Sequence, residues 1–592
     1  MHAIILTAGL GKRMRPKTFN NHKTLLQVGG KTILCRIIDA LLDNNICHIT
    51  IGTGYFEDRL KRYLENNYPQ IQFNYMNNSR FHETNNIYSL SQILNTCEID
   101  DDILLIESDL VFDGSVINRI IHSSYENVAL LDKYRPGMDG TVVEIADNKI
   151  INIFLPHIQD KNFSYENKYK TLNIYKFSNE FCKNVFKKLL NFYVNSIDDN
   201  CYYEYILGVL IYIQKETIYA ELIQDEKWAE VDDVNDLDIA EYIFNPSQRL
   251  KQVNQKFGGL WNYDLLDFCF PINQYFPGES VISEFKNCME ILMKSYSSCQ
   301  SELNKKLSHF LLCNEKHVVM LNGASQIYPF LSQKMFEKNV LMPSLTFGEY
   351  ERIFSNKAYY EDMGQICKNE ISKKLASNDV IVFVNPNNPT GTMIPTNYIY
   401  DLALSNPQKI IVVDESFLDF SKEISIMKLL TDKPLSNILV IKSLSKNLGV
   451  PGLRLGFAFS TNQEWMTFVN QHLPIWNINS MAEHFLELLL KNREYLIQSY
   501  ENMRKDRDLF IKKLSQLDFI SHVFPSQANF IMVKFKNVHT KLTGLSKMLL
   551  EKHRIYVKDL SNKIKDNSVY FRIAVRKQSE NNYFIHCLKK EL

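Results

Sequence analysis

The segment Ile438–Lys446, with the sequence ILVIKSLSK, joins a four-residue apolar run to a turn that contains serine and lysine. A short apolar run of this kind is typical of a strand buried in a sheet. Two similar runs, Val380–Val384 and Ile410–Val413, precede it within an alternating pattern that begins near Leu265. This alternation, followed by an α+β tail to Leu592, predicts an α/β domain.

The first 240 residues show a similar alternation of short apolar runs and helical stretches. A long amphipathic stretch, Thr32–Asn44, follows the first loop. Alternation of this kind predicts a parallel, doubly wound, Rossmann-like sheet. The candidate strands are Ala3–Thr7, Ile49–Gly52, Ile103–Glu107 and Val128–Leu131.

The length of the chain predicts two domains. At 592 residues it exceeds what a single hydrophobic core usually supports. The alternating pattern breaks around Asn245-Pro246-Ser247, and a polar run leads to Gly258-Gly259. We therefore expect an N-terminal domain over 1–243, a connecting segment over 244–264 and a C-terminal domain over 265–592.

Composition favours a cytoplasmic enzyme with small-molecule substrates. Lys plus Arg (67) equals Asp plus Glu (67), so no basic excess indicates a nucleic-acid or membrane-surface partner. The eleven cysteines contain no Cys-x-x-Cys pair, which argues against a disulfide framework or a zinc site. The apolar start, MHAIIL, is too short and not basic enough for a signal peptide. The sequence contains no run of 18 apolar residues, so no membrane-spanning segment is predicted.

A glycine turn directly follows the first predicted strand, in LTAGLGKRMRP at positions 6–16. Glycines there let backbone N–H groups approach a triphosphate, and the neighbouring basic side chains add positive charge. A bare Gly-x-Gly is more often an ordinary turn, but here Lys23 follows at a fitting distance in HKTLL, residues 22–26. The candidate nucleotide-binding residues are Leu6, Ala8, Gly9, Gly11, Lys12 and Thr84.

With Lys23, this stretch resembles the signature of nucleotide-sugar pyrophosphorylases and of phosphocholine and phosphonate cytidylyltransferases. The resemblance implies that Lys23 and Arg13 are catalytic and stabilise charge on the phosphates. Two positions depart from the usual pattern, because His22 stands where proline is common and Lys12 where serine or threonine is common. The segment ETNNIYSL, residues 83–90, looks more like the choline-phosphate branch, so CTP is the expected nucleotide.

Two acidic positions support the same resemblance. Asp109 follows the apolar run in LLIESDL, and Asp232 ends WAEVD. Two carboxylates with triphosphate oxygens suit Mg²⁺, so the resemblance implies that both residues bind this metal. The alternative for Asp232 is a solvated acidic run over 232–236. The pair Tyr203-Glu204 resembles an element through which Glu204 would contact an ammonium group of the acceptor, although ordinary helix surface is an equal alternative.

The C-terminal half carries several motifs in a fixed order. They are NGASQ at 322–326, TFGEY at 346–350, NPNNPTG at 385–391, VVDE at 412–415, SLSK at 443–446, GLRLG at 452–456 and YFRIAV at 570–575. Together they resemble the aspartate-aminotransferase superfamily, fold type I, and within it histidinol-phosphate aminotransferase and threonine-phosphate decarboxylase. The cofactor of these enzymes is pyridoxal 5'-phosphate (PLP).

The resemblance assigns roles to individual residues. Lys446 would form the Schiff base, Asp414 would keep the pyridine nitrogen protonated, and Arg572 would bind the substrate carboxylate. Tyr275 matches a tyrosine that reaches the PLP phosphate of a neighbouring subunit, so a homodimer is expected. The implied PLP-binding residues are Ala324, Ser325, Phe347, Asn388, Asp414, Ser443, Lys446, Arg454 and Tyr275.

Two departures bear on the reaction. Phe417 stands where most relatives have a tyrosine, and Arg576 follows Ala574-Val575 where aminotransferases tend to have Val-Gly-Thr. Both look more like threonine-phosphate decarboxylase, and Arg576 suits a substrate phosphate. They favour decarboxylation over transamination, which stays open.

The fusion predicts two successive reactions in one chain. The leading hypothesis is a CTP-dependent cytidylyltransferase joined to a PLP-dependent decarboxylase that acts on a phosphorylated or phosphonated amino compound. The same cytidylyltransferase joined to an aminotransferase is the second hypothesis. In the third hypothesis, one domain is a degenerate binding or dimerisation module. The sequence argues against it, because it retains Lys446, Asp414, Asp109 and Asp232.

Overall fold

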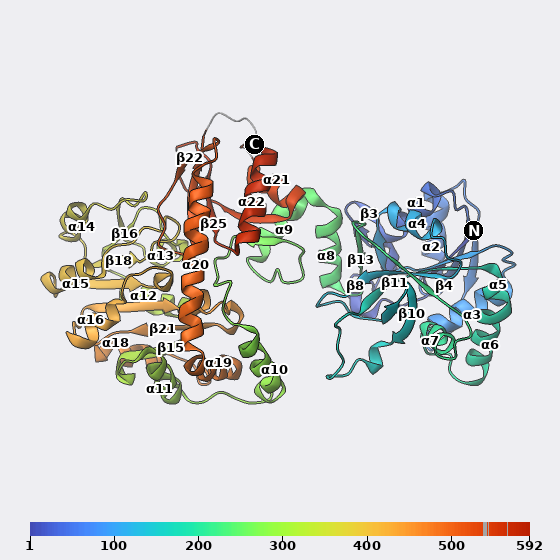
Figure 1. The fold of residues 1–592 in the computed structure, drawn as a ribbon, viewed down its shortest axis with the longest axis horizontal. Helices are drawn as coiled ribbons and strands as arrows, with labels where there is room; N and C mark the ends of the chain where they lie inside the picture. The colour runs from blue at the N-terminus through green and yellow to red at the C-terminus, as the bar shows by residue number, and fades with distance from the viewer. Residues whose placement is uncertain (537–541, 543, 565) are drawn as a thin grey trace. The chain divides into compact units, whose positions relative to one another are not determined.

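A computed structural model describes residues 1–536, 542, 544–564 and 566–592 of the protein. The chain forms two compact units, Met1–Asp264 and Leu265–Leu592 (Figure 1). Each unit has its own sheets and its own hydrophobic cores, and each is described by itself below.

The first unit is built on a nine-stranded sheet with the order β5-β4-β1-β6-β11-β8-β12-β10-β9. Two small pairs, β2–β3 and β7–β13, accompany it. The strands of this unit are β1 (His2–Leu6), β2 (Gln27–Val28), β3 (Lys31–Thr32), β4 (His48–Thr53), β5 (Phe73–Asn77), β6 (Ile103–Glu107), β7 (Leu110–Phe112), β8 (Val128–Lys133), β9 (Val142–Ala146), β10 (Lys149–Phe154), β11 (Tyr169–Phe177), β12 (Tyr219–Leu222) and β13 (Trp228–Glu230).

The expectation of a parallel sheet is wrong for part of the nine-stranded sheet. β5, β4, β1 and β6 run parallel, but β11 is antiparallel to both β6 and β8. β9 and β10 form a hairpin whose two turn residues, Asp147 and Asn148, have φ angles of 49° and 59°. A two-residue turn with positive φ reverses the chain without a crossover helix, so the second half of the sheet is mixed.

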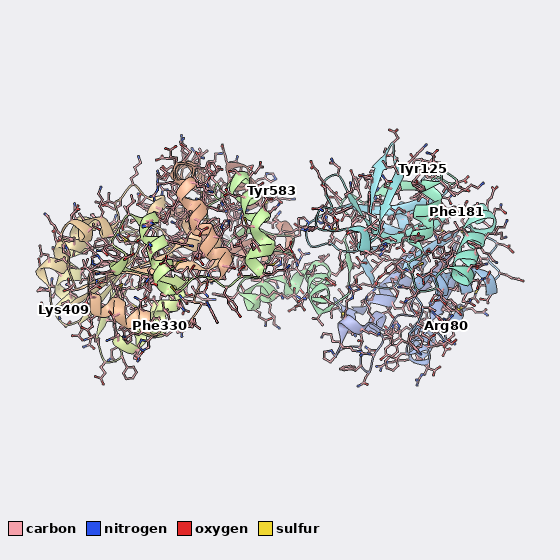
Figure 2. The ribbon with its side chains drawn as sticks, turned by 90° about the horizontal axis from the view of Figure 1, so that it is seen from below. Arg80, Tyr125, Phe181, Phe330, Lys409 and Tyr583 are labelled. Atoms are coloured by element: carbon pink, nitrogen blue, oxygen red, sulfur yellow. The ribbon has the colours of Figure 1, made fainter. Side chains whose placement is uncertain are left out.

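Helices cover both faces of the nine-stranded sheet. α1, α2, α4 and α8 pack on one face, and α3, α6 and α7 pack on the other, where Phe181, labelled in Figure 2, joins the core. The helices of this unit are α1 (Ile33–Asp43), α2 (Glu57–Asn67), α3 (Asn86–Thr96), α4 (Gly114–Ile121), α5 (Asn179–Phe181), α6 (Lys187–Ser196), α7 (Glu204–Tyr212), α8 (Val234–Phe244) and α9 (Arg249–Lys256), with short 3-10 or π turns η1 (Lys12–Met14), η2 (Lys23–Leu25), η3 (Pro156–Ile158), η4 (Cys182–Phe186) and η5 (Pro246–Gln248).

The segment expected as a connection is largely structured. It contains η5 and α9, and it belongs to the first unit, which extends to Asp264. The side chain of Arg249 is buried and donates hydrogen bonds to the carbonyl groups of Tyr242 and Ile243 at the end of α8. These bonds use carbonyl groups that have no partner within the helix, and they fix the chain as it leaves α8.

The second unit contains a seven-stranded sheet and a five-stranded sheet. The larger has the order β15-β21-β20-β19-β18-β16-β17, in which only β21 is antiparallel to its neighbours; the smaller has the order β14-β24-β25-β23-β22. The strands are β14 (Leu266–Phe268), β15 (Val318–Asn322), β16 (Val340–Pro343), β17 (Lys357–Tyr360), β18 (Val380–Val384), β19 (Ile410–Asp414), β20 (Ile438–Ser443), β21 (Leu455–Phe459), β22 (Ile520–Val523), β23 (Phe530–Phe535), β24 (Ile555–Asp559) and β25 (Tyr570–Ala574).

Helices also sandwich the larger sheet of the second unit. α11, α14, α15, α16 and α19 pack on one face, whereas α12, α13 and α18 pack on the other. The long helix α20, orange in Figure 1, packs with α21 and α22 against the smaller sheet. The helices are α10 (Glu279–Met293), α11 (Gln300–Leu311), α12 (Tyr328–Lys334), α13 (Gly348–Ile353), α14 (Lys368–Leu375), α15 (Thr396–Ser405), α16 (Ile426–Asp432), α17 (Leu444–Asn447), α18 (Gln463–Gln471), α19 (Ser480–Lys491), α20 (Arg493–Leu514), α21 (Leu545–His553) and α22 (Gln578–Glu591), with 3-10 turns η6 (Glu315–His317), η7 (Ala324–Ile327), η8 (Leu418–Phe420) and η9 (Pro451–Leu453).

The predicted strands and the predicted helix are confirmed, with shifts of at most two residues at their ends. Short apolar runs fix the strands locally, because these strands are buried on both faces of their sheets. Over the described residues, none of the helices is long and apolar enough to cross a membrane.

Candidate active sites

The glycine turn after β1 lines a cleft of about 670 Å³ in the first unit. Gly11 has a φ of 56° and accepts a hydrogen bond from the Thr18 hydroxyl at 2.8 Å. Nothing lies within 4 Å of the position that a Cβ on Gly9 would occupy, so the backbone there is open to the cleft. The turn therefore offers exposed amides to an anion. The cleft is lined by all the predicted nucleotide-binding residues, Leu6, Ala8, Gly9, Gly11, Lys12 and Thr84.

Lys23 lies between the two predicted metal ligands. Its Nζ is 2.8 Å from Asp232 Oδ1 and 3.2 Å from Asp109 Oδ2. Arg13 approaches the other oxygen of Asp232, with Nη2 at 2.8 Å from Oδ2. Burial lowers the pKa of Lys23, but the two carboxylates outweigh burial and raise it overall. The structure thus brings Lys23, Arg13, Asp109 and Asp232 together on one wall of the cleft, and Lys23 stays charged.

His22 connects the two segments that form this wall. Its ring Nε2 lies 2.8 Å from the Thr7 carbonyl oxygen, and its Nδ1 lies 3.2 Å from the Thr24 backbone nitrogen. Burial lowers the pKa of His22 to about 4, so the ring is neutral. A neutral ring with the proton on Nε2 donates to Thr7 and accepts from Thr24. His22 therefore ties the glycine turn to the segment that carries Lys23.

Glu204 and Glu107 form a second, unpaired acidic wall of the same cleft. Glu204, the first residue of α7, is only 3% exposed, so the alternative of ordinary helix surface is wrong. Asn86 connects the two sides: its Nδ2 donates to Glu107 Oε1 at 2.9 Å, and its Oδ1 accepts from the Tyr203 backbone at 3.0 Å. Burial raises the pKa of Glu107 well above its usual range and that of Glu204 to about 7.

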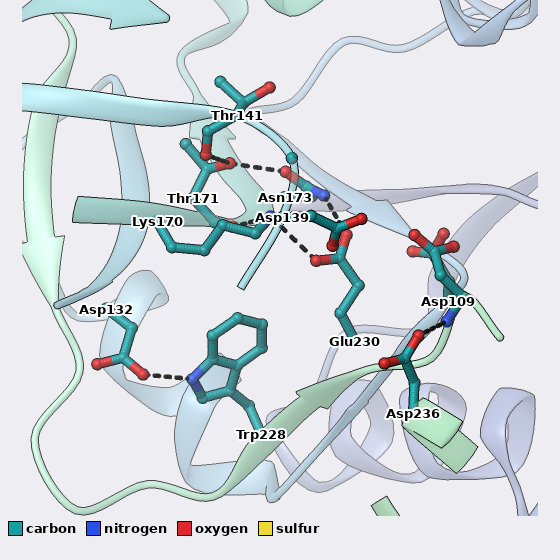
Figure 3. Close-up of polar contacts among 12 residues, drawn as sticks. Asp109, Asp132, Asp139, Thr141, Lys170, Thr171, Asn173, Trp228, Glu230 and Asp236 are labelled. Carbon is teal, nitrogen blue, oxygen red and sulfur yellow. Dashed lines mark hydrogen bonds and ion pairs between the residues drawn. The ribbon is translucent and has the colours of Figure 1, made fainter. Parts of the chain in front are cut away.

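A third acidic group, Glu230, is paired. Its Oε2 lies 3.0 Å from Nζ of Lys170, which is 1% exposed, and its Oε1 accepts from Asn173 at 3.2 Å (Figure 3). Burial raises the pKa of Glu230 to about 7. One oxygen of Asp109, Oδ1, is buried with no hydrogen-bond partner among the described residues.

In the second unit, Lys446 lies on α17, directly after β20. Its backbone carbonyl accepts from the Asn273 backbone N–H at 2.8 Å, which fixes the turn. Burial lowers the pKa of Lys446 to about 8, and the positive charges of Arg572 and Arg454 act in the same direction. The side chain is therefore a ready nucleophile near neutral pH.

Asp414 ends β19, the strand beside β20, and both of its oxygens accept hydrogen bonds. Tyr350 donates through its hydroxyl to Oδ2 at 2.8 Å, and Ser416 donates to Oδ1 through its hydroxyl at 2.5 Å and its backbone N–H at 3.0 Å. Burial raises the pKa of Asp414, whereas these hydrogen bonds and Lys446 oppose that rise. The Ser416 hydroxyl also accepts from the backbone of Ser443 at 2.9 Å, which connects Asp414 to the lysine turn.

The predicted phosphate loop lies at the end of β15. Gly323 has a φ of 74°, and a Cβ there would collide with the Arg454 guanidinium. Arg454 donates to the Ser325 hydroxyl at 3.2 Å. Ala324 and Ser325 begin η7, and Gly456 is also required, because a Cβ there would collide with Ala324. The loop and Arg454 therefore form one tight cationic cradle.

Asn388 and Arg572 meet on the other side of this site. Arg572 Nη1 donates to Asn388 Oδ1 at 2.7 Å, and Nη2 donates to the Cys269 carbonyl. The Nε atom is buried and has no hydrogen-bond partner in the part of the chain that the structure describes. Beneath the Asn388 loop, the buried carboxylate of Asp362 accepts from Asn387 at 2.7 Å. Phe347 immediately precedes α13, and its ring centroid is 6.4 Å from that of Tyr328.

Three predicted residues make contacts that the sequence does not indicate. Arg576 donates to the Asp267 carbonyl at 2.9 Å and pairs with Glu580 at 2.8 Å. The Tyr275 hydroxyl donates to Asp506 at 2.5 Å within its own chain. Phe417 is buried and packs edge-on against Phe530, with ring centroids 5.0 Å apart.

Sequence reasoning missed several residues of the two sites. Ser416 lies two positions after Asp414, so its hydrogen bonds to that carboxylate were a short-range signal that could have been found. Tyr350 lies in a quoted motif, but it is 64 positions from Asp414. Asn86, Lys170 and Glu230 have no such signal, because their partners are between 21 and 117 positions away.

Comparisons with known families agree with this division. The family described as "Aminotransferase class I and II" matches residues 267–588, and the "MobA-like NTP transferase domain" matches residues 3–143. The expected families, the α/β folds and the enzymatic nature of both halves are confirmed, since one half is a nucleotidyltransferase domain and the other a PLP-dependent enzyme domain.

Three relatives are informative. The CMP-5'-(3-aminopropyl)phosphonate synthase of Streptomyces rubellomurinus is 26% identical, over 99% of this chain and 94% of its own length. The L-serine phosphate decarboxylase of Sulfurospirillum multivorans is 29% identical, over 55% of this chain and 88% of its own length. A solved structure of a decarboxylase from the same organism superposes with a TM-score of 0.52 and 25% identity, over 58% of this chain and 91% of that one.

Proposed function

The chain belongs to the aminotransferase class I and II family, and from this premise we propose a bifunctional enzyme with one reaction in each unit. The first unit transfers a cytidylyl group from CTP to a phospho- or phosphono-amino compound. The second unit decarboxylates the related amino acid with PLP. The alignment with CMP-5'-(3-aminopropyl)phosphonate synthase over nearly the whole chain supports this pairing.

In the first unit, we assign the cleft to nucleotide and acceptor. The amides of the turn after β1 would bind the triphosphate, and Lys23 and Arg13 would stabilise negative charge at the α-phosphorus. Asp109 and Asp232 fit Mg²⁺, because both reach one point beside Lys23 and Asp109 has a buried oxygen without a partner. Mg²⁺ with one or two carboxylates and substrate phosphates is a common arrangement. The protein would contribute mainly by aligning the acceptor with the α-phosphorus, and the reaction needs little covalent chemistry from its side chains.

We propose that Glu204 contacts the ammonium group of the acceptor. Glu204 lines the cleft, is nearly fully buried and has an oxygen, Oε2, without a hydrogen-bond partner among the described residues. A buried carboxylate without a partner is costly, and a cationic ligand removes that cost. The assignment of cytidine rests on the resemblance carried by residues 83–90.

The residues of the second unit fit PLP. Lys446 would hold it covalently, Asp414 would accept from its ring nitrogen, and the cradle of Ser325 and Arg454 would bind its phosphate. The buried Ser445 hydroxyl and Arg572 Nε have no partner within the described residues, which leaves donors for a ligand. When bound, PLP supplies an electron sink for the bond broken at the substrate α-carbon.

Within that site the remaining predicted residues complete the binding of PLP and substrate. Phe347 would stack on the ring, Asn388 would donate to its phenolic oxygen and Ser443 would contact its phosphate. Arg572 is oriented for a carboxylate by Asn388, and its free Nε points to an additional acceptor. Arg576 would take the substrate phosphate.

We propose decarboxylation rather than transamination. Phe417 contributes no hydroxyl, and it packs into the apolar core of the small sheet instead. The similarity to L-serine phosphate decarboxylase supports the same choice. Transamination remains the second candidate, because Lys446 is equally suited to carry a proton.

We also propose a homodimer through the second unit. Exposed apolar side chains gather on and after α10, among them Ile291 (67% exposed), Met293 (63%) and Tyr296 (79%). Tyr296 stacks on the half-exposed Trp476 with centroids 4.3 Å apart. Isolated apolar residues are common on protein surfaces, but a group of neighbouring exposed apolar side chains is typical of an interface. Tyr275 would leave Asp506 for the partner's cofactor.

The observation that carries the proposal is the presence, in one chain, of a lysine held between two carboxylates and a second lysine whose pKa is lowered to about 8. The test incubates the protein with CTP, Mg²⁺ and a panel of phospho- and phosphono-amino acids. Pyrophosphate, CO₂ and 2-oxo acids are measured separately. We expect pyrophosphate and CO₂; stoichiometric 2-oxo acid consumption would select the aminotransferase instead.

A further inference from the structure

Charge is distributed unevenly over the cleft of the first unit. Its cationic side chains, Lys12, Arg13 and Lys23, all come from the short segment after the glycine turn. The other wall carries the carboxylates of Glu107, Glu204 and Glu230. The phosphate groups of the nucleotide and of the acceptor belong at the cationic end, so the rest of the acceptor faces the acidic wall.

The cations near the cleft already have partners. Lys23 is shared between Asp109 and Asp232, Arg13 pairs with Asp232, and Lys170 pairs with Glu230. In the part of the chain that the structure describes, neither Glu107 nor Glu204 has an ion-pair partner within 4 Å. The partly buried Glu107 and the buried Glu204 therefore line the cleft, and the described residues supply no ion-pair partner to either.

Asn86 determines which ligand groups this wall accepts. Its amide donor is used on Glu107, and its carbonyl is used by the Tyr203 backbone. Glu204 lines the cleft, and its buried Oε2 has no hydrogen-bond partner among the described residues. The carboxylate form of Glu204 only accepts hydrogen bonds. A primary ammonium offers three donors and a positive charge to such a wall. A carboxylate placed there meets acceptors and like charge.

Lys170 does not change this conclusion, although its charge acts on Glu204. Its side chain is 1% exposed, and its Nζ donates to the Thr171 carbonyl at 3.0 Å while it pairs with Glu230. Release of Lys170 towards a substrate carboxylate would leave Glu230 as a further unpaired buried acid.

We propose that the Glu107–Glu204 wall selects an acceptor that carries a primary ammonium group but no carboxylate on the same carbon. This inference rests on the proposed nucleotidyl transfer and adds the order of the two reactions. Removal of the carboxylate comes first, and its amine product is the substrate of the first unit.

The two steps balance in this order. In the second unit, the bond between the α-carbon and the carboxylate breaks, CO₂ leaves and a proton takes its place on that carbon. In the first unit, a phosphate or phosphonate oxygen of the resulting amine forms a bond to the α-phosphorus of CTP. The bond between the α-phosphorus and the bridging oxygen breaks, and pyrophosphate leaves.

The test compares acceptors that differ only by that carboxylate. Full-length Lys446→Ala, in which the acid cannot be converted, is incubated with CTP and Mg²⁺. The pairs are phosphoserine against phosphoethanolamine and 2-amino-4-phosphonobutyrate against 3-aminopropylphosphonate. We expect kcat/KM for pyrophosphate release to be higher for the amine by about tenfold or more, given the cost of opposing like charges. An equal or higher value for both amino acids overturns the inference.

A second measurement uses the wild-type protein and does not depend on that variant. CO₂ release from the amino acid should proceed at the same rate with and without CTP. A requirement for CTP would mean that nucleotidyl transfer comes first, which contradicts the proposed order. Absence of pyrophosphate with every acceptor would instead reject the proposed nucleotidyl transfer, and this inference with it.

The role of the wall itself is tested with Glu204→Gln, which keeps the shape and removes the charge. The ratio of kcat/KM for phosphoethanolamine to kcat/KM for ethyl phosphate should fall by about tenfold or more, as expected when a charged hydrogen bond is lost. Most of this change should appear in KM. The matched control is Glu98→Gln, an exposed acid on the loop after α3. An unchanged preference in the Glu204 variant overturns the assignment.

Discussion

The two units hold their lysines in opposite electrostatic environments. Lys23 contacts Asp109 at 3.2 Å and Asp232 at 2.8 Å, and these carboxylates raise its pKa despite burial. Lys446 is placed near Arg572 and Arg454, and burial lowers its pKa to about 8. The first lysine is thus a permanent cation, suited to phosphates, and the second is an amine that can act as a nucleophile.

The acidic partners differ in the same way. Asp109 and Asp232 face cations and a cleft, so their charge is available for Mg²⁺ in the proposed reaction. Asp414 is enclosed by hydrogen-bond donors, Tyr350 and Ser416, which hold its carboxylate in one orientation. One unit therefore uses charges around a substrate, whereas the other fixes a single cofactor geometry.

The largest effect is expected from Lys446→Ala. It removes the amine to which PLP would attach in the proposed reaction, so the visible absorbance of the attached cofactor and all CO₂ release should disappear. Pyrophosphate release should stay near the wild-type rate, because the nucleotide cleft lies in a separately packed unit. Absorbance spectra and the pyrophosphate assay check both parts. A retained absorbance band would move the attachment site to another lysine.

A smaller but strong effect is expected from Asp232→Asn. This variant removes one charge from the group that holds Lys23 and Arg13, and nucleotidyl transfer should fall by about 10²-fold, as for loss of a metal-anchoring or charge-stabilising group. PLP absorbance and CO₂ release should persist. Asp233→Asn, which alters the neighbouring helix cap, is the control. If the two variants behave alike, the role of Asp232 is structural.

Much of this comparison was predictable from local sequence. The turn of Ile438–Lys446 and the turn after β1 each lie within a dozen residues, so the motifs place Lys446 and the glycines correctly on their elements. The mixed sheet was missed, although Asp147-Asn148 is a recognisable two-residue turn between β9 and β10.

The rest depends on contacts between distant positions. Asn86 and Tyr203 are 117 residues apart, and Lys170 and Glu230 lie on different strands. Nothing local to Glu204 indicates that it is buried. Tertiary packing determines which charged side chains are buried or paired, and sequence patterns do not indicate that packing.

A dependence on pH separates the two lysines further. Because the pKa of Lys446 is lowered to about 8, attachment of PLP to the apo-protein should slow about tenfold per unit as pH falls below that value, following the neutral amine fraction. Above it the rate should level off. Lys23, with a raised pKa, should stay charged over the same range. Stopped-flow absorbance from pH 6 to 9.5 measures the rate; a flat profile contradicts the assigned pKa.

The smallest effect is expected from Arg576→Ala, which probes the choice between the two PLP reactions. Arg576 is partly neutralised by Glu580 at 2.8 Å, so its contribution to an anionic substrate lies at the lower end for a charged hydrogen bond, about 1.5 kcal/mol. Arg572, with Nε free and no carboxylate partner among the described residues, should matter more. In a decarboxylase, Arg576 would bind the substrate phosphate and so help to orient the substrate carboxylate that is lost. Its loss should then weaken phosphoserine binding about tenfold and slow CO₂ release, while Lys577→Ala, the neighbouring cation, serves as the control. Titration with phosphoserine, monitored by absorbance, measures binding. The rate of CO₂ release is measured separately. Unchanged CO₂ release with weaker binding would limit Arg576 to affinity, and turnover that needs a 2-oxo acid would establish transamination.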